Sequence, residues 1–253
     1  MSHPMHDLTG RRALFVGGSS GMGLASARLF AGLGAEVILA GRSARRLEVA
    51  RRSLGAAGGA ATLAFDITKP GQVERALSRL PAGGIDHLVI TAAAVTHGPF
   101  AEQPVQAVRA MFDSKFWGAY GLVRAALPHL RDGGAVILFS GVLSRRPGLN
   151  CAALGAACAA VEALARGLAL ELGPRLRVNC IAPGMVRTEL HDRVPPERRA
   201  AMFAATGTSL PVGRIGTPDE VAAAVLLAAT NGYMTGHVLD VDGGHMVRQY
   251  ATR

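Results

Sequence analysis

The chain has 253 residues, of which 49% are hydrophobic and 18% charged, which suffices for one sizeable α/β domain. Its net charge of +9 comes almost entirely from arginine, without the aromatic-and-basic stripe of nucleic-acid sites, so we expect no nucleic-acid partner. No apolar run approaches the roughly 18 residues of a membrane span, and residues 1–8 lack an apolar signal core. We therefore expect no membrane partner. The three cysteines have no zinc spacing and are odd in number, so we also expect no metal site and a cytoplasmic protein.

Strand-like and helix-like runs alternate along the chain without a long linker. The predicted order is strand 13–16, helix 21–33, strand 36–40, helix 44–54, strand 61–65, helix 72–80, strand 87–91, helix 104–130, strand 135–140, helix 151–172, strand 177–181, helix 218–229 and strand 237–241. Such alternation predicts a single domain over 1–253, a doubly wound parallel sheet of Rossmann-like α/β class. Its ligands should bind beyond the carboxyl ends of the strands. The irregular stretch 186–214 is expected to form a mobile substrate lid over that crevice.

The segment after the first predicted strand is rich in glycine and opens the first helix. It reads Gly17-Gly18-Ser19-Ser20-Gly21-Met22-Gly23. Glycines allow the backbone to approach a phosphate closely, and the helix N-terminus attracts the negative charge. A merely tight turn is the alternative, but the strand–turn–helix context favours a dinucleotide pyrophosphate.

The end of the second predicted strand indicates which dinucleotide binds. An acidic residue there would hydrogen-bond the adenosine ribose of NAD, but this chain has Arg42 and Ser43. A guanidinium and a hydroxyl can both bind a 2′-phosphate, so we expect NADP(H) rather than NAD(H).

Several short motifs together resemble the short-chain dehydrogenase/reductase family along nearly the whole chain. They are the spaced glycines of 17–23, Asp66-Ile67, Arg177-Val178-Asn179, Pro183-Gly184-Met185-Val186-Arg187-Thr188 and Asp242-Gly243-Gly244. The resemblance implies that Asp66 and Ile67 border the adenine. It implies that Pro183, Gly184, Val186 and Thr188 meet the nicotinamide end, and that Ala93, after the fourth strand, also borders the cofactor. It further implies a homodimer or homotetramer acting on a small molecule.

The catalytic positions of that family are replaced in this chain. Its Asn in the helix after the fourth strand falls on Lys115, and its Ser after the fifth strand falls on Gly141. Its Tyr and Lys fall on Leu154 and Cys158, and no Tyr-x-x-x-Lys pair exists, since Lys69 and Lys115 are the only lysines. The resemblance therefore implies an atypical member without the usual proton relay.

Three side chains are candidates to replace the lost chemistry. Lys115 could act as acid, base or electrostatic clamp, although a lysine in contact with solvent or with Asp113 is the alternative. His97 could be a proton donor, and a loop histidine in contact with water is the alternative. Ser140 offers a hydroxyl, and a hydrogen bond from it to the backbone is the alternative. Cys158 is interpreted as a small core residue.

Two functions remain open from the sequence. The first is an NADP(H)-dependent oxidoreductase on a small carbonyl or alcohol with an altered proton relay. The second is a catalytically inactive or non-redox nucleotide-binding protein on the same scaffold, such as a sensor, a scaffold subunit or a lyase-type enzyme.

Overall fold

The computed structural model describes residues 7–55 and 59–247. Within them, seven strands form one sheet in the order β3-β2-β1-β4-β5-β6-β7, and every neighbouring pair is parallel. The strands are β1 (Arg12–Val16), β2 (Glu36–Gly41), β3 (Ala61–Ala64), β4 (Ile85–Ile90), β5 (Leu130–Phe139), β6 (Arg177–Pro183) and β7 (Val238–Val241). The predicted doubly wound parallel sheet is confirmed.

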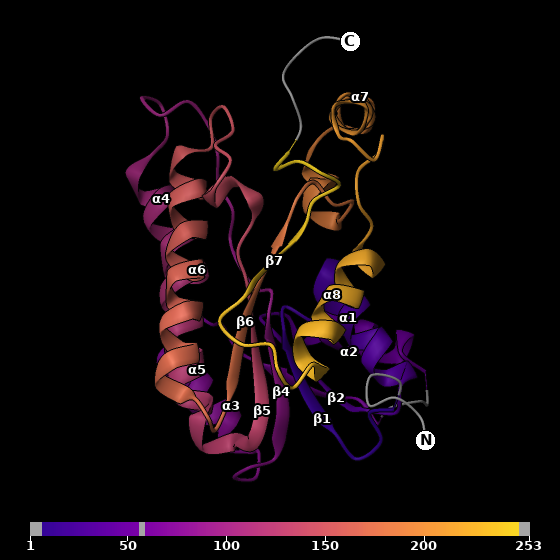
Figure 1. Cartoon of the computed structure of the whole chain (residues 1–253), viewed down its shortest axis with the longest axis vertical. Helices are drawn as coiled ribbons and strands as arrows, with labels where there is room; N and C mark the ends of the chain where they lie inside the picture. Colours follow the sequence, from indigo (N-terminus) through magenta and orange to yellow (C-terminus); the bar gives the residue numbers. More distant parts are fainter. Residues whose placement is uncertain (1–6, 56–58, 248–253) are drawn as a thin grey trace.

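Helices cover both faces of this sheet (Figure 1). The core on one face is built with α3 (Pro70–Leu77), α5 (Gly118–Ala126) and α6 (Ala152–Leu172). The core on the other face is built with α1 (Gly21–Gly32), α2 (Ala44–Ser53) and α8 (Pro218–Thr230). Since both faces are covered, the central strands are mostly apolar, and all six residues of β4 are buried, Asp86 and His87 included.

The strand order places the binding crevice. From β1 the chain proceeds to β2 and β3 on one side, and it then returns to add β4 on the other side of β1. The turns that follow β1 and β4 therefore diverge at the carboxyl edge of the sheet, where ligands of such folds bind. The glycine-rich turn follows β1 at this position.

Two predicted segments differ from the structure. The helix expected over 104–130 is divided into α4 (Val105–Phe112), a π-helical turn (Asp113–Trp117) and α5, and β5 already begins at Leu130. The stretch 186–214, expected to be irregular, contains a short 3₁₀ turn and the helix α7 (Pro196–Ser209). Pro195 and Pro196 begin this helix rather than interrupt one, because proline is well tolerated in the first turn.

The expectation that no apolar run approaches the length of a membrane span was wrong for α6, which, among the described helices, is long and apolar enough to cross a membrane by length and composition. In this fold, however, α6 packs against the sheet, and its residues Val161 and Ala165 belong to the core. It also carries the buried Glu162, whose carboxylate is bonded to side chains of the neighbouring loop. These contacts are those of a core helix in a folded domain.

One buried histidine predicts a pH dependence of stability. His87 of β4 is 7% exposed and lies edge-on to Phe30 at 5.7 Å between ring centroids. Burial lowers the pKa of His87 to about 4. The unfolded chain therefore binds a proton that the folded chain does not between about pH 6.5 and pH 4, so stability falls as the pH falls, by about 3 kcal/mol in total.

Urea unfolding of the wild type and of His87→Leu at pH 7, 5.5 and 4.5 measures this effect. The variant should lose most of the pH dependence in this window, whereas a substitution of the exposed His97 should keep it. Parallel pH profiles for the wild type and His87→Leu would contradict the assignment.

Candidate functional site

The glycine-rich turn packs so tightly that only glycine fits at its ends. A Cβ on Gly17, whose φ is +96°, would lie 2.4 Å from Thr91 Oγ1 and 2.7 Å from the Ala92 amide nitrogen. A Cβ on Gly23 would lie 2.4 Å from the Gly17 carbonyl oxygen. The side chain of Ser20 precedes α1 without capping it, which leaves the helix N-terminus open to an external acceptor. This geometry fits a phosphate.

The turn after β2 lies beside the glycine-rich turn and carries positive charge. Arg42 and Ser43 are both exposed, and the Ser43 hydroxyl caps α2 by accepting a hydrogen bond from the Arg46 amide at 3.3 Å. The Arg46 guanidinium in turn donates to Ser20 Oγ at 3.1 Å. Sequence reasoning did not single out Arg46 beside this turn, although its place in the first turn of α2 was a usable signal.

Asp66 and Ile67 follow β3 on the same edge. Burial alone would raise the pKa of Asp66, but hydrogen bonds from the Thr68 amide and hydroxyl and the charge of Arg42 lower it. Ile67 is buried against α5, where a Cβ on Gly118 would lie 3.1 Å from its side chain. The carboxylate is therefore an ionised hydrogen-bond acceptor next to Arg42.

The segment 183–188 leaves β6 and folds back over the glycine-rich turn. The Gly184 amide donates to the Val241 carbonyl at 3.0 Å, and Val186 forms a parallel bridge with Gly216. Thr188 reaches α1, because a Cβ on Gly21 would lie 3.3 Å from its methyl carbon. The structure thus brings the predicted cofactor residues of β1, β2, β3 and β6 to one edge of the sheet.

A cavity of about 290 Å³ lies between this segment and α7. It is lined by Arg187, Thr188, Glu189, Asp192, Arg199, Phe203 and Pro218. The Arg187 guanidinium carbon stands 5.3 Å from the centroid of the Phe203 ring, which attaches α7 to the segment by a cation–π contact. Residues 186–214 therefore pack against the segment that leaves β6, and their role as a mobile substrate lid stays a prediction.

Lys115 points into the protein and not toward solvent. It lies in the π-helical turn, its side chain is 7% exposed, and its Nζ donates to the carbonyl oxygens of Phe139 at 3.0 Å and Ser140 at 3.2 Å. A π-helical turn rotates side chains relative to an α-helix, and such turns are frequent at functional sites. The alternative, a lysine in contact with solvent or with Asp113, is not what the structure shows. Lys115 is a buried cation at the carboxyl end of β5.

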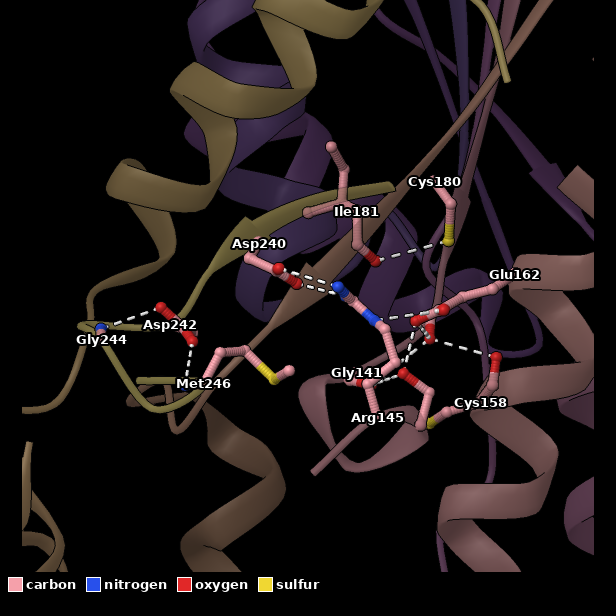
Figure 2. Close-up of polar contacts among 12 residues, drawn as sticks. Gly141, Arg145, Cys158, Glu162, Cys180, Ile181, Asp240, Asp242, Gly244 and Met246 are labelled. Atoms are coloured by element: carbon pink, nitrogen blue, oxygen red, sulfur yellow. Dashed lines mark hydrogen bonds and ion pairs between the residues drawn. The ribbon is translucent and has the colours of Figure 1, made fainter. Parts of the chain in front are cut away.

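A buried carboxylate stands one turn of α6 beyond Cys158 (Figure 2). Glu162 is 3% exposed, and its Oε1 accepts hydrogen bonds from the hydroxyls of Ser140, at 2.9 Å, and Ser144. Arg145 places its Nε 3.3 Å from Glu162 Oε2 and forms a bidentate pair with Asp240 of β7. One arginine therefore faces two carboxylates, so the cluster keeps a net negative charge and Arg145 is already occupied.

Sequence reasoning missed Glu162, Ser144 and Asp240 as members of this cluster. Glu162 had a recognisable signal, because it interrupts the apolar face of α6 beside Val161 and Ala165. Ser140 was predicted as a site residue, and its single hydroxyl proton is directed to the protein interior, toward Glu162 or the Cys158 carbonyl at 3.1 Å.

Leu154 and Cys158 lie in a small apolar cluster. Met111, Leu154, Ala157 and Cys158 are buried together, with Val95, Val108, Phe112, Leu143 and Ala153 packed around them. Burial raises the pKa of the Cys158 thiol, against the opposing effects of Lys115 and Ser140, so the thiol stays neutral at pH 7. Beside it, a Cβ on Gly141 would lie 3.3 Å from the sulfur. Cys158 therefore packs as the predicted small core residue.

His97 lies in the loop that follows β4, apart from these buried groups. It is exposed, and the neighbouring Gly98 amide donates to the Asn150 carbonyl at 2.9 Å, which joins the loop after β4 to the start of α6. The predicted catalytic residues thus fall into two places, with Lys115 and Ser140 buried beneath the end of β5 and His97 in contact with solvent. In the same loop, Ala93 is exposed toward the crevice edge that follows β4.

Known proteins resemble the chain over nearly its full length. Residues 16–246 match a family described as enoyl-(acyl carrier protein) reductase. Galactitol 2-dehydrogenase (L-tagatose-forming) of Cereibacter sphaeroides is 34% identical, covering 95% of this chain and 96% of that protein. A structure of a small-chain dehydrogenase in complex with NADPH has a TM-score of 0.78 and 35% identity, covering 92% of this chain and 97% of the other. The Pseudomonas aeruginosa RhlG/NADP active-site complex has a TM-score of 0.87 and 32% identity, covering 96% and 99%.

Proposed function

Since this chain belongs to the short-chain dehydrogenase/reductase family, we propose that it is an NADP(H)-dependent oxidoreductase acting on a small carbonyl or alcohol. The observation that carries the proposal is the cofactor edge. A phosphate-sized turn closed by Gly17 and Gly23 stands beside Arg42 and Ser43, with no carboxylate at the end of β2. Galactitol 2-dehydrogenase and the NADPH and NADP complexes among the similar proteins support the same cofactor and substrate class.

Different residues of the chain would hold different parts of the dinucleotide in such a reaction. The turn 17–23 would hold the pyrophosphate, Arg42 and Ser43 the 2′-phosphate, and Asp66 with Ile67 the adenine. Ala93, Pro183, Gly184, Val186 and Thr188 would hold the nicotinamide end. When bound, the dinucleotide supplies the hydride acceptor or donor, and the protein supplies its orientation.

An altered relay would have to exchange the proton that accompanies hydride transfer. Leu154 and Gly141 offer no exchangeable side-chain proton, whereas His97 is exposed in the loop that follows β4. We assign proton exchange with the substrate oxygen to His97. Lys115 contributes a buried positive charge under the end of β5, where its Nζ donates to the Ser140 carbonyl. The Ser140 hydroxyl in turn donates to Glu162 Oε1.

The apolar cluster favours a second candidate function. Leu154 and Cys158 are packed into a small core and carry no charge at pH 7, which suits a nucleotide-binding protein without redox turnover, or an enzyme of another reaction class such as a lyase. Cofactor binding is common to both candidates. Consumption of NADPH with small carbonyl compounds separates them, because only the first requires it.

We propose a homodimer or homotetramer in the cytoplasm, with small-molecule ligands and with no nucleic-acid or membrane partner. The exposed Trp117 and Tyr120, whose rings contact each other at 6.1 Å, lie on the surface of the π-helical turn and α5 and suit a subunit contact. Light scattering of the purified protein tests the oligomer.

Arg42→Ala tests the cofactor assignment. The variant should bind NADPH about 10- to 100-fold more weakly, because a charge-assisted, bidentate contact to the 2′-phosphate is lost. Binding of NADH, which lacks this phosphate, should change by less than about twofold. Calorimetric titration of both dinucleotides measures the difference, and an equal loss for both would remove Arg42 from the 2′-phosphate site.

A further inference from the structure

The arginines around α2 divide into two groups. Arg51 and Arg52 at the C-terminal end both form ion pairs with Glu48, at 2.8 and 2.9 Å. Arg42, Arg45 and Arg46 at the N-terminal end have no ion pair within the part of the chain that the structure describes. Three exposed cations therefore stand together at the end of the helix that adjoins the cofactor edge.

Only one of these three is bonded to the glycine-rich turn. The Arg46 guanidinium donates to Ser20 Oγ at 3.1 Å, and the Arg46 amide donates to Ser43 Oγ at 3.3 Å. Because β1 and β2 are paired in parallel, the turns that follow them open at the same edge of the sheet. Arg46 thus spans the gap between the two turns that would hold the adenosine half of a dinucleotide.

The electrostatics of this edge call for a second cation. A phosphate monoester carries about −1.5 to −2 charges at pH 7. Arg42 supplies one positive charge, and it lies near enough to the Asp66 carboxylate to help lower the pKa of that group. A 2′-phosphate held by Arg42 alone would carry more negative charge than the site compensates, with a carboxylate close by. Arg46 supplies the missing positive charge without a competing carboxylate.

We propose that Arg46 is the second cationic arm of a site for the 2′-phosphate of adenosine, opposite Arg42, and that Ser20 is its positioning residue. The inference rests on the proposed NADP(H) function and adds a specificity-determining residue to it. A guanidinium has five N–H donors, so one can stay on Ser20 while others bind phosphate oxygens. The Ser43 hydroxyl accepts from the Arg46 amide, and its own proton remains available to the same phosphate.

Two nucleotides that differ only in the 2′-phosphate test this site, namely 2′,5′-ADP and 5′-AMP. Calorimetric titration of the full-length Arg46→Ala variant should show about tenfold weaker binding of 2′,5′-ADP, and 5′-AMP binding within about twofold of wild type. Arg46→Lys, which keeps the charge but loses the planar fork, should recover only part of the affinity. Ser20→Ala should weaken 2′,5′-ADP binding by about threefold, because the guanidinium is then less well ordered.

Arg45→Ala is the matched control, since it removes the same charge from the adjacent residue of the same helix turn. It should leave both nucleotides within about twofold of wild type. Wild-type affinity for 2′,5′-ADP in Arg46→Ala, or an equal loss in Arg45→Ala, would overturn the assignment of Arg46. If instead the wild type binds 2′,5′-ADP no better than 5′-AMP, the NADP(H) function itself is wrong. The two failures are therefore distinguishable.

Discussion

Lys115→Met should lower the free energy of unfolding by about 2–4 kcal/mol, an effect large for one lysine. The side chain keeps its length and loses its three donors, so the carbonyls of Phe139 and Ser140 lose their hydrogen bonds to Nζ. Each buried acceptor left without a donor costs about 1–3 kcal/mol, partly offset because the ammonium no longer has to be desolvated.

The sheet itself explains why these two carbonyls need a side-chain donor. The Ser140 amide donates to the Ile181 carbonyl, so the next donor of a parallel ladder to Ser140 would be the amide of residue 183, which is proline. On the other side, Thr91 and Ala92 turn away from β5, because both of their amides donate to Val16 of β1. Lys115 completes the hydrogen bonding at the end of β5.

Urea unfolding of Lys115→Met measures this contribution. Lys69→Met is the matched control, because Lys69 is the only other lysine and is exposed, and its loss should change stability by less than about 0.5 kcal/mol. Equal stabilities for the two variants would contradict the buried role. Once a carbonyl substrate is known, slower turnover by Lys115→Met at unchanged NADPH affinity would show that Lys115 also has a catalytic role. Unchanged turnover would show that its role is structural alone.

Gly23→Ala should abolish tight dinucleotide binding and lower the free energy of unfolding by about 3 kcal/mol. The added Cβ would lie 2.4 Å from the Gly17 carbonyl oxygen and 2.6 Å from Thr91 Oγ1. Backbone oxygen cannot move away without displacing the glycine-rich turn from α1, so the phosphate site and the helix packing are lost together.

Gly32→Ala provides the control within the same helix, because a Cβ there meets nothing within 4 Å. It should raise stability by up to about 1 kcal/mol through helix propensity and leave NADPH binding unchanged. Chemical denaturation and NADPH titration of both variants test the pair. Normal NADPH binding by Gly23→Ala would show that the turn does not have to pack this closely.

The sequence alone determined the parts of this protein that depend on local pattern. Apolar runs of strand length alternate with helical periods, so the doubly wound sheet was predictable, and the glycines of 17–23 identified the phosphate turn. The break at Asp113–Trp117 was not predictable, because the residues on both sides have continuous helical periodicity. The helix α7 was hidden for a related reason, since the two prolines at its start are as typical of an irregular segment as of a helix N-terminus.

Only the tertiary structure decided which polar groups meet. Arg46 and Ser20 are 26 residues apart, Lys115 and Ser140 are 25 apart, and Arg145 and Asp240 are 95 apart. Local periodicity carries no information on such pairs, because parallel crossovers bring distant turns to one edge of the sheet. Lys115 illustrates the difference. That it is one of two lysines was visible in the sequence. Its partners, however, are two backbone carbonyls at the end of β5. These carbonyls lack backbone donors because Pro183 lies on one neighbouring strand and the other neighbouring strand turns toward β1.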